Sequence, residues 1–109
     1  MSIKYKIIID PQAKLDLKEI FIYVAMNDSI HSANRLLDAL EDICYKLEKY
    51  PARGHIPPEL RQTGIKSYLE IHYKSYRIIY EIEHNSIYIH AVIDGRRNVQ
   101  EILSNRILR

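Results

Sequence analysis

The chain has few of the residues on which covalent or phosphate-binding chemistry depends. It contains one cysteine, so an internal disulfide is excluded and nothing points to an oxidising compartment. Its three glycines, at positions 54, 64 and 95, form no glycine-rich phosphate loop. No apolar run approaches the roughly 20 residues that span a bilayer, and no signal peptide precedes the first predicted strand. We therefore expect a cytoplasmic protein that has no contact with a membrane.

Metal-binding and thiol chemistry are equally poorly represented. The five histidines lack the helical or loop spacing of metal ligands, and no cysteine cluster accompanies them. They are His31, His55, His72, His84 and His90. Cys44 lies on an apolar helical stripe, which favours a core position over a nucleophile. The sequence therefore predicts no metal site and no cofactor.

What remains is a small domain with an uneven charge distribution. A chain of 109 residues makes one domain, spanning 1–109, and can bury roughly 65% of its unfolded surface. Residues 1–52 hold seven Lys or Arg against eight Asp or Glu, whereas residues 53–109 hold nine against six. The basic half could meet phosphate or an acidic protein partner, or it could be ordinary surface decoration.

The N-terminal half predicts one strand followed by two helices. Residues 3–9 alternate and then become fully apolar, as in a strand with a buried end. Asp10-Pro11 is a helix start, and the apolar spacing carries that helix to about Asn27. A second start at Asp28-Ser29 opens a helix that reaches about Tyr50. With so short a joint, the two helices should form an antiparallel hairpin.

The C-terminal half predicts a loop, three strands and a short helix. The proline-rich segment 51–66 should be a loop with one helical turn at 58–60. Alternating residues then predict strands over 68–73, 76–82 and 87–93, and Asn98 caps a final helix. The order β-α-α-β-β-β with a short C-terminal helix predicts an α+β fold. In this fold the helical hairpin covers one face of an antiparallel sheet.

The alternation also predicts which side chains face away from the hairpin. In strand 87–93 it places Ile87, Ile89, Ala91 and Ile93 on one face. The face of the sheet opposite the hairpin should then be open. We expect it to carry Tyr68, His72, Arg77, Glu81 and His90.

Arginines on that face are the strongest indication of function. An unpaired guanidinium is too costly to bury, so Arg77 must face a carboxylate, a phosphate or water. Metal-free RNA cleavage would use Arg77 with Arg96 or Arg97 at the phosphate, and proton carriers among His72, His90 and Glu81. Alternatively, Arg77 and Glu81 neutralise each other, and the histidines are merely solvated. The abundant tyrosines favour core or rim positions over base stacking.

Four short motifs, in this order and spacing, resemble the RelE/ParE superfamily of toxins from bacterial type II toxin–antitoxin systems. They are Asp10-Pro11-Gln12-Ala13, Pro51-Ala52-Arg53-Gly54, Tyr76-Arg77-Ile78-Ile79-Tyr80 and Gly95-Arg96-Arg97. The resemblance covers nearly the whole chain, and the fold of the superfamily agrees with the predicted sheet and hairpin. It implies a toxin that is silenced by a small cognate antitoxin.

The superfamily has an RNA-cutting RelE-like branch and a gyrase-poisoning ParE-like branch. Matching this chain by Arg77 and Arg97 places Tyr68 and Glu70 where the first branch has assisting lysines, and Leu103 where it has a tyrosine. A glutamate beside a scissile phosphate would repel it. The resemblance is therefore closer to the ParE-like branch, from which no catalytic residues are carried over.

The resemblance thus implies an inhibitor of DNA gyrase that acts by direct binding. An arm of the antitoxin would hydrogen-bond a strand edge and pair its acidic residues with Arg77, Arg96 or Arg97. The residues expected to bind a partner or a phosphate are Tyr68, Arg77, Arg96 and Arg97. One alternative is a ribosome-dependent mRNA endonuclease that uses Arg77 and Arg97, with His72 or Glu81 as proton carrier. Another is a decayed toxin that only binds its antitoxin and tunes repression.

Overall fold

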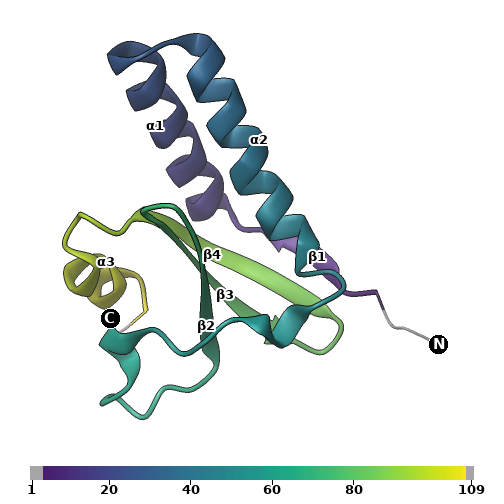
Figure 1. The fold of residues 1–109 in the computed structure, drawn as a ribbon. Helices are drawn as coiled ribbons and strands as arrows, with labels where there is room; N and C mark the ends of the chain where they lie inside the picture. Colours follow the sequence, from purple (N-terminus) through teal and green to yellow (C-terminus); the bar gives the residue numbers. More distant parts are fainter. Residues whose placement is uncertain (1–3, 108–109) are drawn as a thin grey trace.

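A computed structural model describes residues 4–107, and its order of elements confirms the predicted α+β fold (Figure 1). The elements are β1 (Lys6–Ile9), α1 (Pro11–Asn27), α2 (Ile30–Lys46), two 3₁₀ turns (Pro51–Arg53 and Pro58–Leu60), β2 (Tyr68–Tyr73), β3 (Tyr76–Glu83), β4 (Ser86–Asp94) and α3 (Val99–Arg106). The helical turn expected at 58–60 is present. Residue 3 of the first predicted strand lies outside the described residues.

The sheet has four strands in the order β1-β4-β3-β2. Strands β2, β3 and β4 form the predicted antiparallel meander. Strand β1 joins the edge of that meander in parallel with β4, with Ile7 opposite Ile87. The α1–α2 hairpin and strands β2 and β3 lie between these two strands in the chain, which gives a connection long enough for parallel pairing. The complete sheet is therefore mixed.

Side-chain caps begin both long helices. The Asp10 carboxylate accepts a hydrogen bond of 2.9 Å from the Ala13 amide, and proline occupies the first turn of α1. The Ser29 hydroxyl accepts a bond of 3.0 Å from the Ser32 amide at the start of α2. Helix α2 ends at Lys46, before the predicted limit near Tyr50, because the chain turns there. Within residues 4–107, no helix is long and apolar enough to cross a bilayer.

The hairpin packs on one face of the sheet and forms the larger core, as predicted (Figure 1). Leu40, Cys44 and Leu47 of the second helical segment are fully buried there. They meet Ile78 and Tyr80 of β3, which are also fully buried. Burial raises the pKa of the Cys44 thiol to about 12, so this cysteine is a core residue.

The opposite face is not open, because α3 covers part of it (Figure 1). A second core forms between α3 and the sheet; its buried members are Ile79, Ala91, Ile93, Val99 and Leu103. The predicted common face for Ile87, Ile89, Ala91 and Ile93 is wrong. A β-bulge shifts the register, since Ile79 pairs with Ala91 whereas Tyr80 pairs with Ile89. His90 is the extra residue, and after it the alternation of β4 is inverted.

Asp16 of α1 ties this bulge to the C-terminal helix. Its Oδ2 accepts a hydrogen bond of 2.9 Å from the amide of Val92, just after the bulge. The same carboxylate pairs with the Arg106 guanidinium through two contacts of 2.6 Å. Asp16 is 5% exposed, so both partners are needed to satisfy its buried charge. One side chain thus fastens α1, β4 and α3 together.

Candidate functional site

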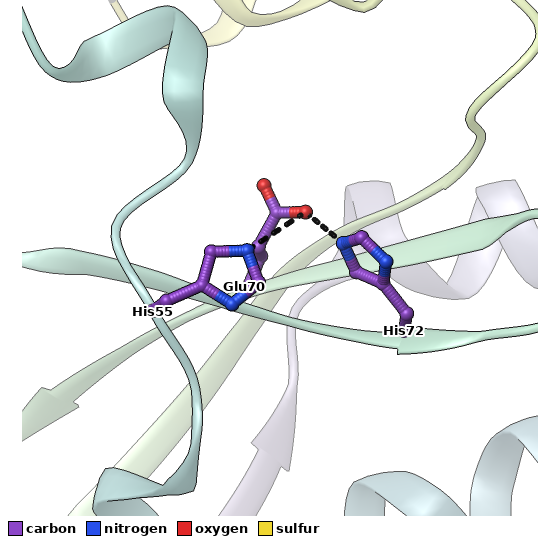
Figure 2. A group of neighbouring side chains, drawn as sticks. All are labelled: His55, Glu70 and His72. Atoms are coloured by element: carbon purple, nitrogen blue, oxygen red, sulfur yellow. Dashed lines mark hydrogen bonds and ion pairs between the residues drawn. The ribbon is translucent and has the colours of Figure 1, made fainter.

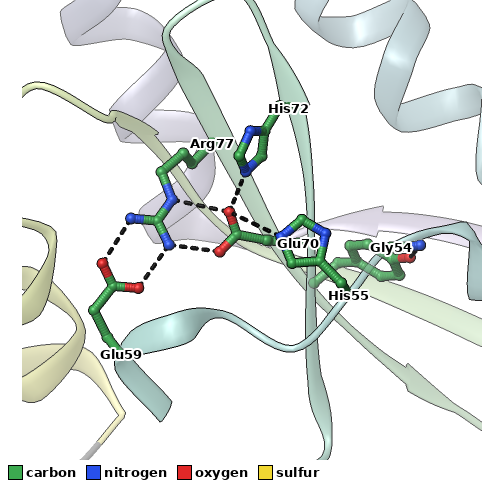
Figure 3. Close-up of polar contacts among 7 residues, drawn as sticks. Gly54, His55, Glu59, Glu70, His72 and Arg77 are labelled. Carbon is green, nitrogen blue, oxygen red and sulfur yellow. Dashed lines mark hydrogen bonds and ion pairs between the residues drawn. The ribbon is translucent and has the colours of Figure 1, made fainter. Parts of the chain in front are cut away.

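Arg77 is engaged by carboxylates from two directions (Figure 3). Its Nε and Nη2 contact the two oxygens of Glu70, on the neighbouring strand β2, at 2.9 and 2.5 Å. Its Nη1 and Nη2 contact the two oxygens of Glu59, in the second 3₁₀ turn, at 2.8 and 2.6 Å. The side chain is 13% exposed. The sequence predicts that Arg77 faces a carboxylate, a phosphate or water, and in the structure it faces two carboxylates.

This double pairing changes the ionisation of its members. Hydrogen bonds from Arg77 hold the pKa of Glu59 below its usual range. Hydrogen bonds to Glu59 and Glu70 raise the pKa of Arg77 above its usual value, against the effect of burial. The three side chains carry a net charge of −1, since two carboxylates surround one guanidinium. A phosphate approaching Arg77 would have to displace an existing ion pair and would meet this excess negative charge.

The residues suggested as proton carriers divide between two separate clusters. His72 bonds through Nε2 to Glu70. Glu81 does not pair with Arg77; its carboxylate lies 3.0 Å from Nε2 of His90. The other ring nitrogen of His90 lies 2.8 Å from Asp10. The structure thus brings His72 next to Arg77 through Glu70, and it places Glu81 in a separate cluster around the bulge.

Tyr68 belongs to the bulge cluster as well. Its ring contacts the ring of His90 edge-on, with the centroids 5.4 Å apart. It is half-buried and packs against the core beneath α3. Burial and the nearby Glu81 raise the pKa of its hydroxyl. Tyr68 therefore contributes to packing under α3.

The two arginines after β4 lie at the surface. Arg96 pairs with Asp94, through contacts as short as 2.6 Å, and its side chain is 73% exposed. Arg97 is exposed, and no carboxylate within residues 4–107 pairs with it. Both line a groove between α1 and the end of the sheet, together with Tyr23 and Tyr76. Arg97 is the member of the predicted arginine set that is accessible to an external negative group.

A second groove runs along the outer edge of the sheet. Strand β1 lies at the edge of the sheet, and the groove runs between this strand and the helical hairpin. The lining is mostly apolar, with Leu17, Phe21 and Leu37 among its members. Lys14 and Lys18 border it from α1. An edge strand beside apolar side chains and lysines can accept an added strand that carries acidic residues.

The opposite edge of the sheet is already in part covered. His55 forms an antiparallel bridge with Glu70, exchanging backbone hydrogen bonds of 3.1 and 2.7 Å. Glycine at position 54 permits this close approach, since a Cβ there would lie 2.6 Å from the Tyr80 hydroxyl. That hydroxyl donates to the Pro51 carbonyl at 2.7 Å and accepts from the Gly54 amide at 3.0 Å. Among residues 4–107, no such bridge covers the outer edge of β1.

The same bridge brings together three potential ligands that the sequence spacing did not predict (Figure 2). Nitrogens of His55 and His72 and an oxygen of Glu70 all lie within 4.8 Å of one another. Glu70 and His72 are separated by two positions on β2, so they share a face. His55 arrives from a distant segment, and nothing in the sequence signals its pairing. The histidines lack local ligand spacing, and it is the bridge between distant segments that brings His55 to Glu70 and His72.

Comparison with known proteins identifies the family. The sequence model of the ParE toxin of the type II toxin–antitoxin system parDE matches residues 7–99. Among curated relatives, Toxin ParE3 of Caulobacter vibrioides is 24% identical over 91 residues, covering 84% of this chain and 87% of that protein. The chain is therefore a toxin of the type II toxin–antitoxin class. It belongs to the ParE family within the RelE/ParE superfamily.

Solved structures agree on the fold. The chromosomal ParDE toxin–antitoxin system from P. aeruginosa includes a chain with a TM-score of 0.71 at 12% identity, covering 85% of this chain and 98% of that one. The toxin–antitoxin complex RelBE2 from Mycobacterium tuberculosis includes one with a TM-score of 0.62 at 19% identity, covering 86% and 94%. Both likenesses concern the arrangement of strands and helices. They show that the sheet and hairpin described above are the fold of known toxin–antitoxin components.

Proposed function

We propose that this ParE-family toxin inhibits DNA gyrase by direct binding and does not cleave RNA. The observation that carries the proposal is the pairing of Arg77 with Glu59 and Glu70. The one strand arginine that an RNA-cutting mechanism would require is held by two carboxylates, and Glu70 stands at a position where the RNA-cutting branch has a lysine. Catalysis of phosphoryl transfer depends on preorganised positive charge. Here Glu59 and Glu70 offset the positive charge of Arg77.

Arg97 and Arg96 are the partner-facing residues in this proposal. They lie beside Tyr23 and Tyr76 in the groove between α1 and the end of the sheet. Exposed arginine next to aromatic side chains is a common composition for the centre of a protein–protein contact. The side chain of Arg77 packs against Gly95, just before these two arginines. A Cβ at Gly95 would lie 3.3 Å from the Cδ of Arg77.

We also propose that the cognate antitoxin occupies the groove along β1. Its extended arm would add a strand to the free edge of β1, place apolar side chains against Leu17 and Phe21, and pair its acidic residues with Lys14 and Lys18. Such an arm would order on binding. The support is the combination of a free strand edge, an apolar floor and a basic border in one place.

Expression in growing bacteria tests the target. If gyrase is the target, induction of the toxin should raise the level of gyrase–DNA cleavage complexes and leave transcripts intact during translation. The variant Arg97→Glu should reduce the growth defect, whereas Arg61→Glu, an exposed site away from the groove, should not. Fragmented transcripts with unchanged cleavage complexes would establish the endonuclease alternative. A wild-type chain that leaves growth unaffected would indicate a decayed toxin.

A further inference from the structure

We propose that His55, Glu70 and His72 form a binding site for a divalent transition-metal ion, with Zn²⁺ as the ion that fits best. The site lies at the edge of β2 that the segment after the first 3₁₀ turn covers (Figure 2). It is distinct from the proposed gyrase and antitoxin surfaces and does not depend on either.

The ligands are set side by side by backbone geometry. His55 and Glu70 are directly opposite each other across the antiparallel bridge, and Glu70 and His72 are two positions apart on one strand. Opposed residues have Cβ atoms roughly 5 Å apart, and alternate residues of a strand point the same way. The three side chains therefore emerge on one face of this sheet edge. The ligand atoms lie within 4.8 Å of one another, so small side-chain rotations would close them around an ion.

The ligand set has the composition of a known kind of zinc site. Two imidazole nitrogens and one carboxylate oxygen hold Zn²⁺ in sites that keep a fourth position for water. Both histidines present about half of their side-chain surface to solvent, 53% for His55 and 51% for His72. Solvent can therefore reach the fourth position. Glu70 is 1% exposed and supplies the fixed, buried ligand.

A second layer of contacts orients Glu70, as metal ligands require. Arg77 holds both of its oxygens, and Glu59 in turn holds Arg77 (Figure 3). The two carboxylates outnumber the guanidinium, which leaves one negative charge for a cation to offset. With neutral imidazoles, the ion would replace the His72 proton that now bonds to Glu70. The bound ion would also clamp the segment around His55 to β2.

Titration of the full-length, tag-free chain with Zn²⁺ tests the site. Calorimetry should show one ion per chain, and melting should occur about 10 °C higher at roughly a hundredfold excess of free Zn²⁺ over Kd. His55→Ala and His72→Ala should each weaken binding at least about tenfold, and the double variant should abolish it. The matched control is His31→Ala, an exposed histidine on α2, which should bind as the parent does.

Histidine nitrogen NMR supplies a second readout that does not depend on melting. Zn²⁺ should shift the Nε2 resonances of His55 and His72, because these are the ring nitrogens that face Glu70, and it should leave His31 unchanged. The proposal is overturned if Zn²⁺ neither binds nor raises the melting temperature. It is equally overturned if the double variant still binds as the parent does, or if His31→Ala weakens binding as much as His55→Ala. Gyrase inhibition is not a readout of either experiment, so each proposal can fail without the other.

Discussion

At the scale of single residues, the decisive feature is the neutralisation of Arg77 within the protein. A guanidinium whose N–H groups already bond to two carboxylates stabilises the folded chain and has little capacity to bind an external phosphate. The sequence predicts that Arg77 needs a negative partner. It does not predict Glu59, because that residue comes from the loop before β2 and only the folded chain brings the two together. Glu70 is recognisable in the sequence only as an unexpected acid at a position where the RNA-cutting branch has a lysine.

The first prediction concerns acid stability. The pKa of Glu59 is lower in the folded chain than in the unfolded chain, so its ion pair stabilises the protein above the ordinary glutamate pKa of about 4.3. That stability should be lost as the pH falls through the lower, folded-state pKa. The variant Glu59→Gln should therefore show a smaller loss of unfolding free energy between about pH 6 and 3 in urea titrations. Glu83→Gln, an exposed change on β3, should retain the parental slope.

Removing the guanidinium gives a second prediction. Arg77→Met leaves Glu70 buried without its cationic partner, and breaking such a pair costs about 3–5 kcal/mol of unfolding free energy. The double variant Arg77→Met with Glu70→Gln should recover part of this loss, because the buried charge is then gone. Chemical denaturation of the three proteins measures both effects. A single variant as stable as the parent would show that the pairing does not operate in solution.

At the scale of elements, local periodicity predicts the helices and strands well but not the register of β4. The caps at Asp10 and Ser29 and the apolar stripes indicate α1 and α2 directly, because those signals are local. The bulge at His90 has no local signature, and it moves Ala91 and Ile93 to the face beneath α3. The parallel pairing of β1 and the bridge at His55 also depend on segments distant in sequence.

Asp16 allows a prediction about the attachment of α3. Arg106→Ala should release this helix, so amide hydrogens of residues 99–106 should exchange faster while those of β3 remain protected. Asp16→Ala should in addition leave the Val92 amide unsatisfied and lower the unfolding free energy by about 3–5 kcal/mol. Lys18→Ala, an exposed change on the same helix, is the control. Unchanged exchange in Arg106→Ala would mean that the apolar contacts of α3 alone hold it.

At the scale of the whole molecule, the chain presents different surfaces for different purposes. The face of the sheet opposite the hairpin, predicted to be open, is largely occupied by α3 and by internal ion pairs. Accessible features include the edge of β1 with the lysines of α1 beside it, and the groove that carries Arg97. A protein of this form is suited to binding other proteins, which agrees with membership of the ParE family.

The most direct test of the proposed function is a supercoiling assay with purified DNA gyrase. The chain should inhibit supercoiling, and Arg97→Glu should require a higher concentration for the same inhibition. The double variant Arg77→Met with Glu70→Gln, provided that it is folded, should inhibit as the parent does, because Arg77 acts within the protein. Unimpaired supercoiling at saturating amounts of a folded parent chain would contradict the account.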